Sequence, residues 1–110
     1  MKKIYICGHI NHDQLQTTVK AFKQATIELY QAGKNPINMM EKPLWDIDNR
    51  AEELTLRIKT MQPCQEVFVL PSWDDDRLAH IELAAAIVLG KTIIYANDAI
   101  KTRSIIFFNN

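Results

Sequence analysis

VFVLPSWDDDRLAHIELAAAIVLGKTIIY, residues 67 to 95, contains the pattern that decides the fold. It runs from an apolar, β-rich segment through an acidic loop into an apolar helical segment, stops at Gly90, and ends in a second apolar segment. Short continuous apolar runs are typical of parallel strands that are covered on both faces. The stretch therefore predicts a strand, a crossover helix and a second strand, joined in the usual right-handed sense.

The same unit is repeated toward the N-terminus. Residues 4–7 form a third apolar run, followed by a helical pattern at residues 14–32 that Gly33 ends. A short strand at residues 35–38 comes next, and its Pro36 places it at a sheet edge or at the start of a strand. A second helix closes near Pro63, before the strand at residues 66–70.

Side-chain spacing predicts which face of each helix is buried and where each helix begins. Asn11 or Asp13 is the expected N-cap of the first helix, and Asp46 or Asp48 that of the second. The expected apolar faces are Leu15, Val19, Phe22, Ala25, Ile27, Leu29 and Tyr30 in the first helix, Ala51, Leu54, Ile58 and Met61 in the second, and Leu78, Ile81, Ala84, Ala85 and Val88 in the third.

Strands that alternate with helices indicate an α/β fold. We predict a small three-layer doubly wound domain, Rossmann- or flavodoxin-like, with a four- or five-stranded, mainly parallel sheet. The 110 residues are enough for one such domain, spanning 1–110. Residues 97–110 are expected to form a C-terminal tail or an edge strand, with an apolar run at 105–108.

Charge and composition limit the partners and the location. With 13 basic and 13 acidic side chains, the chain has no net charge to attract a nucleic-acid polymer or a membrane surface. A small molecule is the expected partner, and the near-neutral surface favours a homo-oligomer. Cys7 and Cys64 match no metal or disulfide spacing and are expected to be buried thiols in a reducing compartment. Because no signal peptide or apolar membrane span is found, we expect a cytoplasmic, soluble protein.

The ligand site of a doubly wound sheet lies beyond the carboxyl ends of its strands. This rule selects three loops, at residues 8–13, 39–48 and 71–76. Gly8 and His9 lie in the first, while Ser72, Trp73 and Asp74 lie in the third. A tryptophan there is either a stacking platform for a base or a packing residue. The loop after Gly8 lacks the glycine spacing of dinucleotide and P-loop sites.

Glu82 is the candidate catalytic residue, because it is a carboxylate within a mostly apolar helix. A partly buried carboxylate is costly unless it has a partner or a role. The alternative is a glutamate at the margin of the apolar face that pairs with Arg77 or Lys91. The acidic run at residues 74–76 is explained by helix capping and the helix dipole, or by a divalent-metal site.

Three segments resemble the nucleoside 2-deoxyribosyltransferase-like superfamily, and most closely its small DUF4406 branch. They are MKKIYICG at residues 1–8, LPSW at residues 70–73, and the helix Ala79-x-x-Glu82-x-x-x-Ala86-x-x-x-Gly90-Lys91. The likeness spans residues 1 to 96 with the order of elements preserved. Where related proteins usually carry a glycine four residues before the glutamate, this chain has Leu78, which would reshape the sugar pocket.

The resemblance implies an enzyme of N-glycosidic bonds that uses neither a cofactor nor a metal. In the active relatives a helix glutamate attacks the anomeric carbon of a 2′-deoxynucleoside and expels the base. Glu82 falls on this nucleophile position, and Asp76 on that of an aspartate that contacts the base. Related nucleoside monophosphate hydrolases carry a serine where Asp76 stands. Since an acid repels a phosphate, Asp76 favours a substrate without one.

Three functional hypotheses follow. The first is a (deoxy)nucleoside transferase or a nucleoside or nucleotide hydrolase with Glu82 as nucleophile. The second is a non-catalytic module that binds a nucleoside or nucleotide in the same cleft. The third is an oligomeric interaction protein that shares only the fold. The first requires Glu82 and Asp76 to face one concave site. A Glu82–Arg77 pair on an outer face would argue against it.

Overall fold

A computed structural model of the chain describes residues 2–41 and 49–96. Four strands alternate with three helices along the sequence. The strands are β1 (Lys3–Cys7), β2 (Asn35–Ile37), β3 (Glu66–Val69) and β4 (Thr92–Tyr95). The helices are α1 (Leu15–Gln31), α2 (Arg50–Met61) and α3 (Arg77–Val88), and the 3₁₀ turns η1 (Met39–Glu41) and η2 (Pro71–Asp75) follow β2 and β3.

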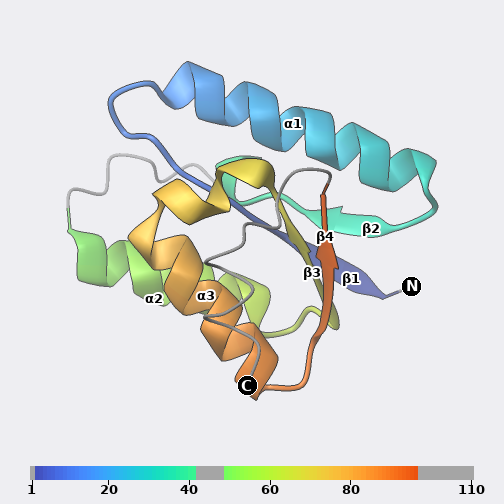
Figure 1. Cartoon of the computed structure of the whole chain (residues 1–110). Helices are drawn as coiled ribbons and strands as arrows, with labels where there is room; N and C mark the ends of the chain where they lie inside the picture. Colours follow the sequence, from blue (N-terminus) through green and yellow to red (C-terminus); the bar gives the residue numbers. More distant parts are fainter. Residues whose placement is uncertain (1, 42–48, 97–110) are drawn as a thin grey trace.

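The four strands form one parallel sheet in the order β2-β1-β3-β4. Helix α1 lies on one face of the sheet, and α2 and α3 lie on the other (Figure 1). The predicted α/β, doubly wound class is therefore confirmed, and Pro36 lies in an edge strand as its missing N–H requires. The tail or fifth strand predicted at residues 97–110 lies outside the described residues.

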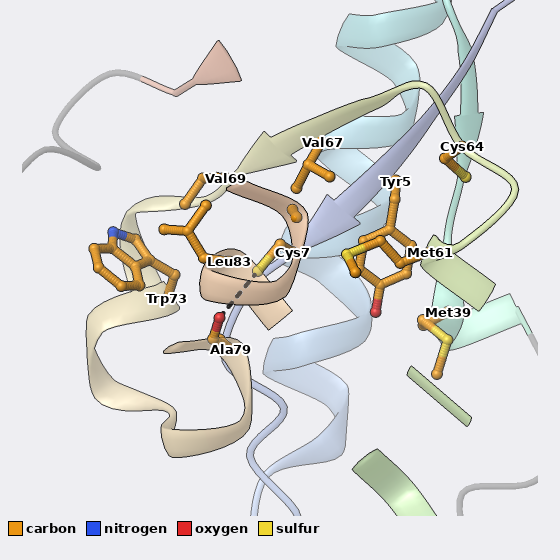
Figure 2. Packing of buried hydrophobic residues seen from close by; sticks show 11 residues of the cluster. Tyr5, Cys7, Met39, Met61, Cys64, Val67, Val69, Trp73, Ala79 and Leu83 are labelled. Atoms are coloured by element: carbon orange, nitrogen blue, oxygen red, sulfur yellow. Dashed lines mark hydrogen bonds between the residues drawn. The ribbon is translucent and has the colours of Figure 1, made fainter. Parts of the chain in front are cut away.

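The central strand β1 serves two cores because its side chains alternate between the faces of the sheet. Ile4 and Ile6 pack with Phe22, Ala25 and Leu29 of α1. Tyr5 and Cys7 point to the opposite face, where the core is completed by Met39, Met61, Cys64, Val67, Val69, Trp73, Ala79, Leu83 and Ala86 (Figure 2). This second core, beneath α2 and α3, is the one that borders the functional site.

The predicted buried faces of α2 and α3 are only partly correct: Met61 is buried, and Ile58 and Ala85 pack against the core, but the other fully buried residues were not predicted. The buried residues of α2 are Glu53, Arg57, Thr60 and Met61, and those of α3 are Ala79, Glu82, Leu83 and Ala86. Ile81 and Val88 of α3, by contrast, are 42% and 85% exposed. Helix α3 is apolar around most of its circumference, so periodicity alone does not fix its face. In α2 the apolar stripe did not identify the whole buried face. Glu53 and Arg57 are buried as well, because they form an ion pair with each other.

Helix α1 buries part of its predicted face. Phe22, Ala25 and Leu29 are buried as expected, together with Thr18 and Thr26. Leu15 is partly buried against the same core, whereas Val19, Ile27 and Tyr30 of the predicted face are exposed. The buried face of α1 is therefore narrower than predicted and also includes two threonines, Thr18 and Thr26.

The helix N-caps also differ from the prediction, whereas the C-terminal glycines agree with it. Helix α1 begins after Gln14 without a side-chain cap, since the Asn11 carboxamide oxygen accepts the Asp13 N–H instead. Helix α2 is capped by Asn49, and the predicted Asp46 and Asp48 lie outside the described residues.

Gly33 and Gly90 follow the ends of α1 and α3 with φ of 78° and 75°, a conformation that glycine adopts readily. Within residues 2–41 and 49–96, none of the helices has the length and apolar character needed to cross a membrane.

Candidate functional site

A cleft of about 420 Å³ opens beyond the carboxyl ends of β1 and β3. The loop after β1, the N-terminal part of α2, and the junction of η2 with α3 form its walls. Its lining residues are His9, Ile10, Arg50, Glu53, Arg57, Asp75, Asp76, Arg77 and Leu78. The loops after the first and third strands thus contribute to one concave site, and the side chain of Leu78 lies in its wall.

Arg57 forms a buried cationic centre at this cleft, with only 1% of its side chain exposed. Its Nε and Nη2 donate to Glu53 Oε2 at 3.0 and 2.7 Å. Nη2 also donates to Asp76 Oδ2 at 3.0 Å, and Nη1 donates to Glu82 Oε1 at 2.8 Å. One guanidinium therefore bridges three carboxylates, one from α2, one from α3 and one from the N-cap residue of α3.

The charge of Arg57 is stable in this environment. Burial alone would lower the pKa of Arg57, but the attraction of Glu82 and Asp76 outweighs burial and raises the pKa above its ordinary value. Burial likewise favours the neutral form of Glu53, yet Arg57, His12 and Arg50 lower the pKa of Glu53. Arg57 and Glu53 are consequently both held in their ionised forms.

Glu82 lies directly beneath the cleft on the inner face of α3 and is 0% exposed. Its Oε1 accepts from Arg57, and its Oε2 accepts from the Tyr5 hydroxyl of β1. Burial raises the pKa of Glu82 to about 7, although Arg57 and Tyr5 act in the opposite direction. Glu82 does not itself line the cleft, and Arg57 is the residue that connects the two.

Asp76 ties the loop after β1 to the start of α3. Its Oδ1 caps α3 by accepting the Ala79 N–H, and its Oδ2 accepts the Ile10 N–H, both at 2.9 Å. The same Oδ2 lies 3.1 Å from His9 Nδ1. Burial would raise the pKa of Asp76, but Arg57 and the two backbone N–H groups lower it.

The other predicted binding residues separate into different environments. His9 lines the cleft, and its N–H donates to Ser72 Oγ at 3.2 Å. Ser72 itself lines a second groove, of about 480 Å³, beside α1. Asp74 pairs with His80.

Trp73 lies in the core rather than in the cleft. It is 0% exposed, and its ring centroid is 4.5 Å from that of His80. Trp73 is therefore a packing residue and not a stacking platform in the cleft. The 3₁₀ turn η2 directs its indole toward Leu83 and Val69 of the core beneath α3 (Figure 2).

Gly8 is a packing residue against Leu70 and does not line the cleft. A Cβ built on Gly8 would lie 2.9 Å from Leu70 Cδ1 and 3.2 Å from Leu70 Cβ. Gly8→Ala is therefore expected to lower the free energy of unfolding by about 1–3 kcal/mol through overpacking. Urea denaturation measures this loss, and in a double-mutant cycle Gly8→Ala should cost less in a Leu70→Ala background than in the wild type. Unchanged stability in Gly8→Ala would contradict the close contact.

Three residues of the site were missed by sequence reasoning: Tyr5, Glu53 and Arg57. Glu53 and Arg57 are one helical turn apart, and this spacing is equally typical of an ion pair exposed to solvent and of a buried one. One signal in the sequence could have indicated Arg57: a buried carboxylate such as Glu82 needs a cation to pair with. Tyr5 offered another, since a tyrosine in a buried strand needs an acceptor for its hydroxyl.

The alternative partners proposed for Glu82 lie elsewhere. Arg77 is exposed at the cleft, and Lys91 donates to the carbonyl oxygens of Gln62 and Cys64. In the described part of the chain, no three His, Cys, Asp or Glu side chains are grouped so that they could hold a metal ion. The cation among the three acids of the site is the Arg57 guanidinium.

Fold and site together define a small doubly wound α/β protein with an ion-paired cleft at the carboxyl edge of its sheet. The family model described as "Domain of unknown function (DUF4406)" matches residues 2–95, and the chain belongs to this family. No curated protein and no solved structure gives a significant match. The matched region includes every strand and helix of the described structure.

Proposed function

We propose that the cleft binds a (deoxy)nucleoside or nucleotide and that the protein cleaves or transfers its N-glycosidic bond with Glu82 as nucleophile. One observation carries the proposal. Glu82 is buried behind the cleft-lining Arg57 and is held by two donors, Arg57 and Tyr5, whose hydrogen bonds favour its ionised form. An ionised carboxylate in a site with little water is the nucleophile that a glycosyl transfer requires.

The reaction proceeds in two displacements. A Glu82 oxygen forms a bond to the anomeric carbon as the bond from that carbon to the base nitrogen breaks. The electron pair of the broken bond stays on the base, which takes up a proton from water, and the sugar is left as an ester of Glu82. Water or a second base then attacks the anomeric carbon and releases the carboxylate. Arg57 and Tyr5 offset the charge that returns to Glu82 in this step.

The remaining cleft residues bind and orient the ligand in this proposal. His9 is 33% exposed, and Asp76 fixes its ring from behind. His9 therefore offers the ligand a hydrogen-bonding nitrogen in a defined orientation. Asp76 contributes by fixing His9 and Arg57, rather than as a free carboxylate, because all of its oxygens already accept hydrogen bonds from the protein.

A non-catalytic nucleoside- or nucleotide-binding module is the second candidate. It is favoured by the complete burial of Glu82 and by the pairing of both its oxygens within the protein. Catalysis requires the ligand to reach Glu82 past the Arg57 guanidinium, whereas binding requires only the open cleft. The two candidates therefore differ in whether a bound ligand is consumed.

A panel of 2′-deoxynucleosides, ribonucleosides and their 5′-monophosphates tests both candidates. Calorimetry measures binding, and chromatography measures the free base after incubation with and without an acceptor base. We expect one class to bind and to release its base. Binding without base release supports the binding module, and the absence of binding across the panel contradicts the proposed function.

The activity is expected to rise with pH. Since the nucleophile is the ionised form and the pKa of Glu82 is about 7, kcat/KM should increase as the pH rises through about 7 and then level off. Below this midpoint the carboxyl carries a proton and cannot attack. Base release measured at constant ionic strength gives the profile. A kcat/KM that falls through the same range would mean that the protonated acid is the active form.

A further inference from the structure

Arg57 has one hydrogen-bond donor that is not used within the described protein. A guanidinium carries five N–H donors. Nε donates to Glu53, the two hydrogens of Nη2 go to Glu53 and Asp76, and one hydrogen of Nη1 goes to Glu82. The second Nη1 hydrogen has no acceptor among residues 2–41 and 49–96, and Arg57 lines the cleft.

The guanidinium is held too firmly to move away from this position. Three hydrogen bonds on its Nε and Nη2 side hold it to Glu53 and Asp76. Glu53 is held in turn by Arg50 and His12, each at 2.7 Å, and Asp76 by two backbone N–H groups. Nη1 is therefore held in one position, hydrogen-bonded to Glu82, on a side chain that lines the cleft.

A ligand oxygen that accepts the remaining hydrogen would share Nη1 with the Glu82 carboxylate. Two hydrogen bonds of ordinary length that diverge from one trigonal nitrogen place their acceptors about 5 Å apart. A bound ligand would thus be brought next to Glu82 without any rearrangement of the buried cluster. This spacing is short enough for a neighbouring ligand carbon to approach the carboxylate.

We propose that Arg57 is a positioning residue that binds an oxygen of the ligand through Nη1 and so couples occupancy of the cleft to the state of Glu82. This inference rests on the proposed function and deepens it by assigning the contact that aligns the substrate. It also assigns the specificity of the Nη1 contact, which takes an acceptor such as a phosphate, hydroxyl or carbonyl oxygen.

Several charged or titratable groups surround Glu82 and determine how it responds. Tyr5 and Cys7 face it from β1, Arg57 from α2, and Asp76 from the start of α3. Glu53 contacts Arg57, and His9 contacts Asp76. Arg57 is the cation of this set that contacts Glu82. An anionic oxygen on Nη1 offsets part of the charge of Arg57, so it should raise the pKa of Glu82.

The test follows the Glu82 carboxyl carbon by NMR in protein labelled at the glutamate δ-carbon, with the resonance assigned by its absence in Glu82→Gln. The titration midpoint is measured in the free protein and with 2′-deoxyadenosine 5′-monophosphate, 2′-deoxyadenosine or inorganic phosphate. The variants are Arg57→Lys and the charge-balanced Arg57→Gln/Glu53→Gln. The control is Arg50→Gln, which removes another cleft arginine that contacts Glu53 but not Glu82.

In the free protein, Arg57→Gln/Glu53→Gln should raise the Glu82 midpoint by more than about one pH unit, while Arg50→Gln leaves it nearly unchanged. A bound probe should shift the Glu82 resonance in the wild type. Loss of Arg57 should weaken the binding of that probe at least about tenfold. An unchanged midpoint in the folded Arg57 variants would overturn the inference. So would a probe that binds the wild type without moving Glu82. Failure of every probe to bind would instead count against the proposed function, and the free-protein midpoints would still decide whether Arg57 controls Glu82.

Discussion

Arg57→Met is expected to lower the free energy of unfolding by about 3–5 kcal/mol, because it leaves buried carboxylates without their cation. Glu53 and Glu82 are fully buried, and Asp76 is nearly so. This loss is a large fraction of the 5–15 kcal/mol that typically stabilises a domain, so Tm should fall by more than about 10 °C. Thermal and urea denaturation near neutral pH measure the effect.

Arg50→Met is the matched control for this prediction. Arg50 pairs with the same Glu53, but its side chain is 64% exposed, and an exposed pair contributes only about 1 kcal/mol or less. Arg57→Met should also become less destabilising as the pH falls, since protonated carboxyls no longer need the cation. Equal losses in the two variants would show that Arg57 does not neutralise the buried acids.

Glu82→Gln is expected to lower the rate of base release by a factor of about 10³ or more while the ligand still binds. The carboxamide keeps the shape of the side chain and can accept from Arg57, but it is a poor nucleophile. The contacts of the ligand with His9 and Arg57 remain in place. Initial rates of base release and the affinity for the same ligand, measured side by side, separate the chemical step from binding.

The control for Glu82→Gln is Glu66→Gln. Glu66 of β3 is also a buried carboxylate paired with a cation, Lys34, but it does not line the cleft. Its replacement should leave base release within about twofold, as expected for a residue remote from the chemistry. Base release that survives in Glu82→Gln, or that disappears equally in Glu66→Gln, would contradict the role given to Glu82.

Local sequence patterns were sufficient to predict the order and class of the elements. Apolar runs such as residues 67–70 and 92–95 had to be strands because they are short, continuous and bounded by polar loops or glycine. Gly33 and Gly90 located the helix ends because each adopts a positive φ. What the patterns could not determine is which side of α3 faces the sheet, since its exposed Val88 and buried Leu83 are equally apolar.

The candidate site was only partly predictable, for an electrostatic reason. Glu82 was identified as a carboxylate in an apolar helix and Asp76 through the family resemblance, and both contact Arg57. That contact depends on residues 19 and 25 positions apart, which no local pattern encodes. Trp73 was assigned to the ligand site because it lies in the right loop, but the sequence did not contain the turn geometry that directs its ring into the core.

The most direct test of the central claim, that Glu82 attacks the sugar, is the mass of the protein during turnover. The protein is mixed with the substrate that releases its base, quenched in acid, and examined intact and as peptides by mass spectrometry. We predict a covalent adduct equal in mass to the glycosyl group, located on Glu82 and absent from Glu82→Gln. Base release with no adduct on Glu82, or with an adduct on another residue, would contradict the claim.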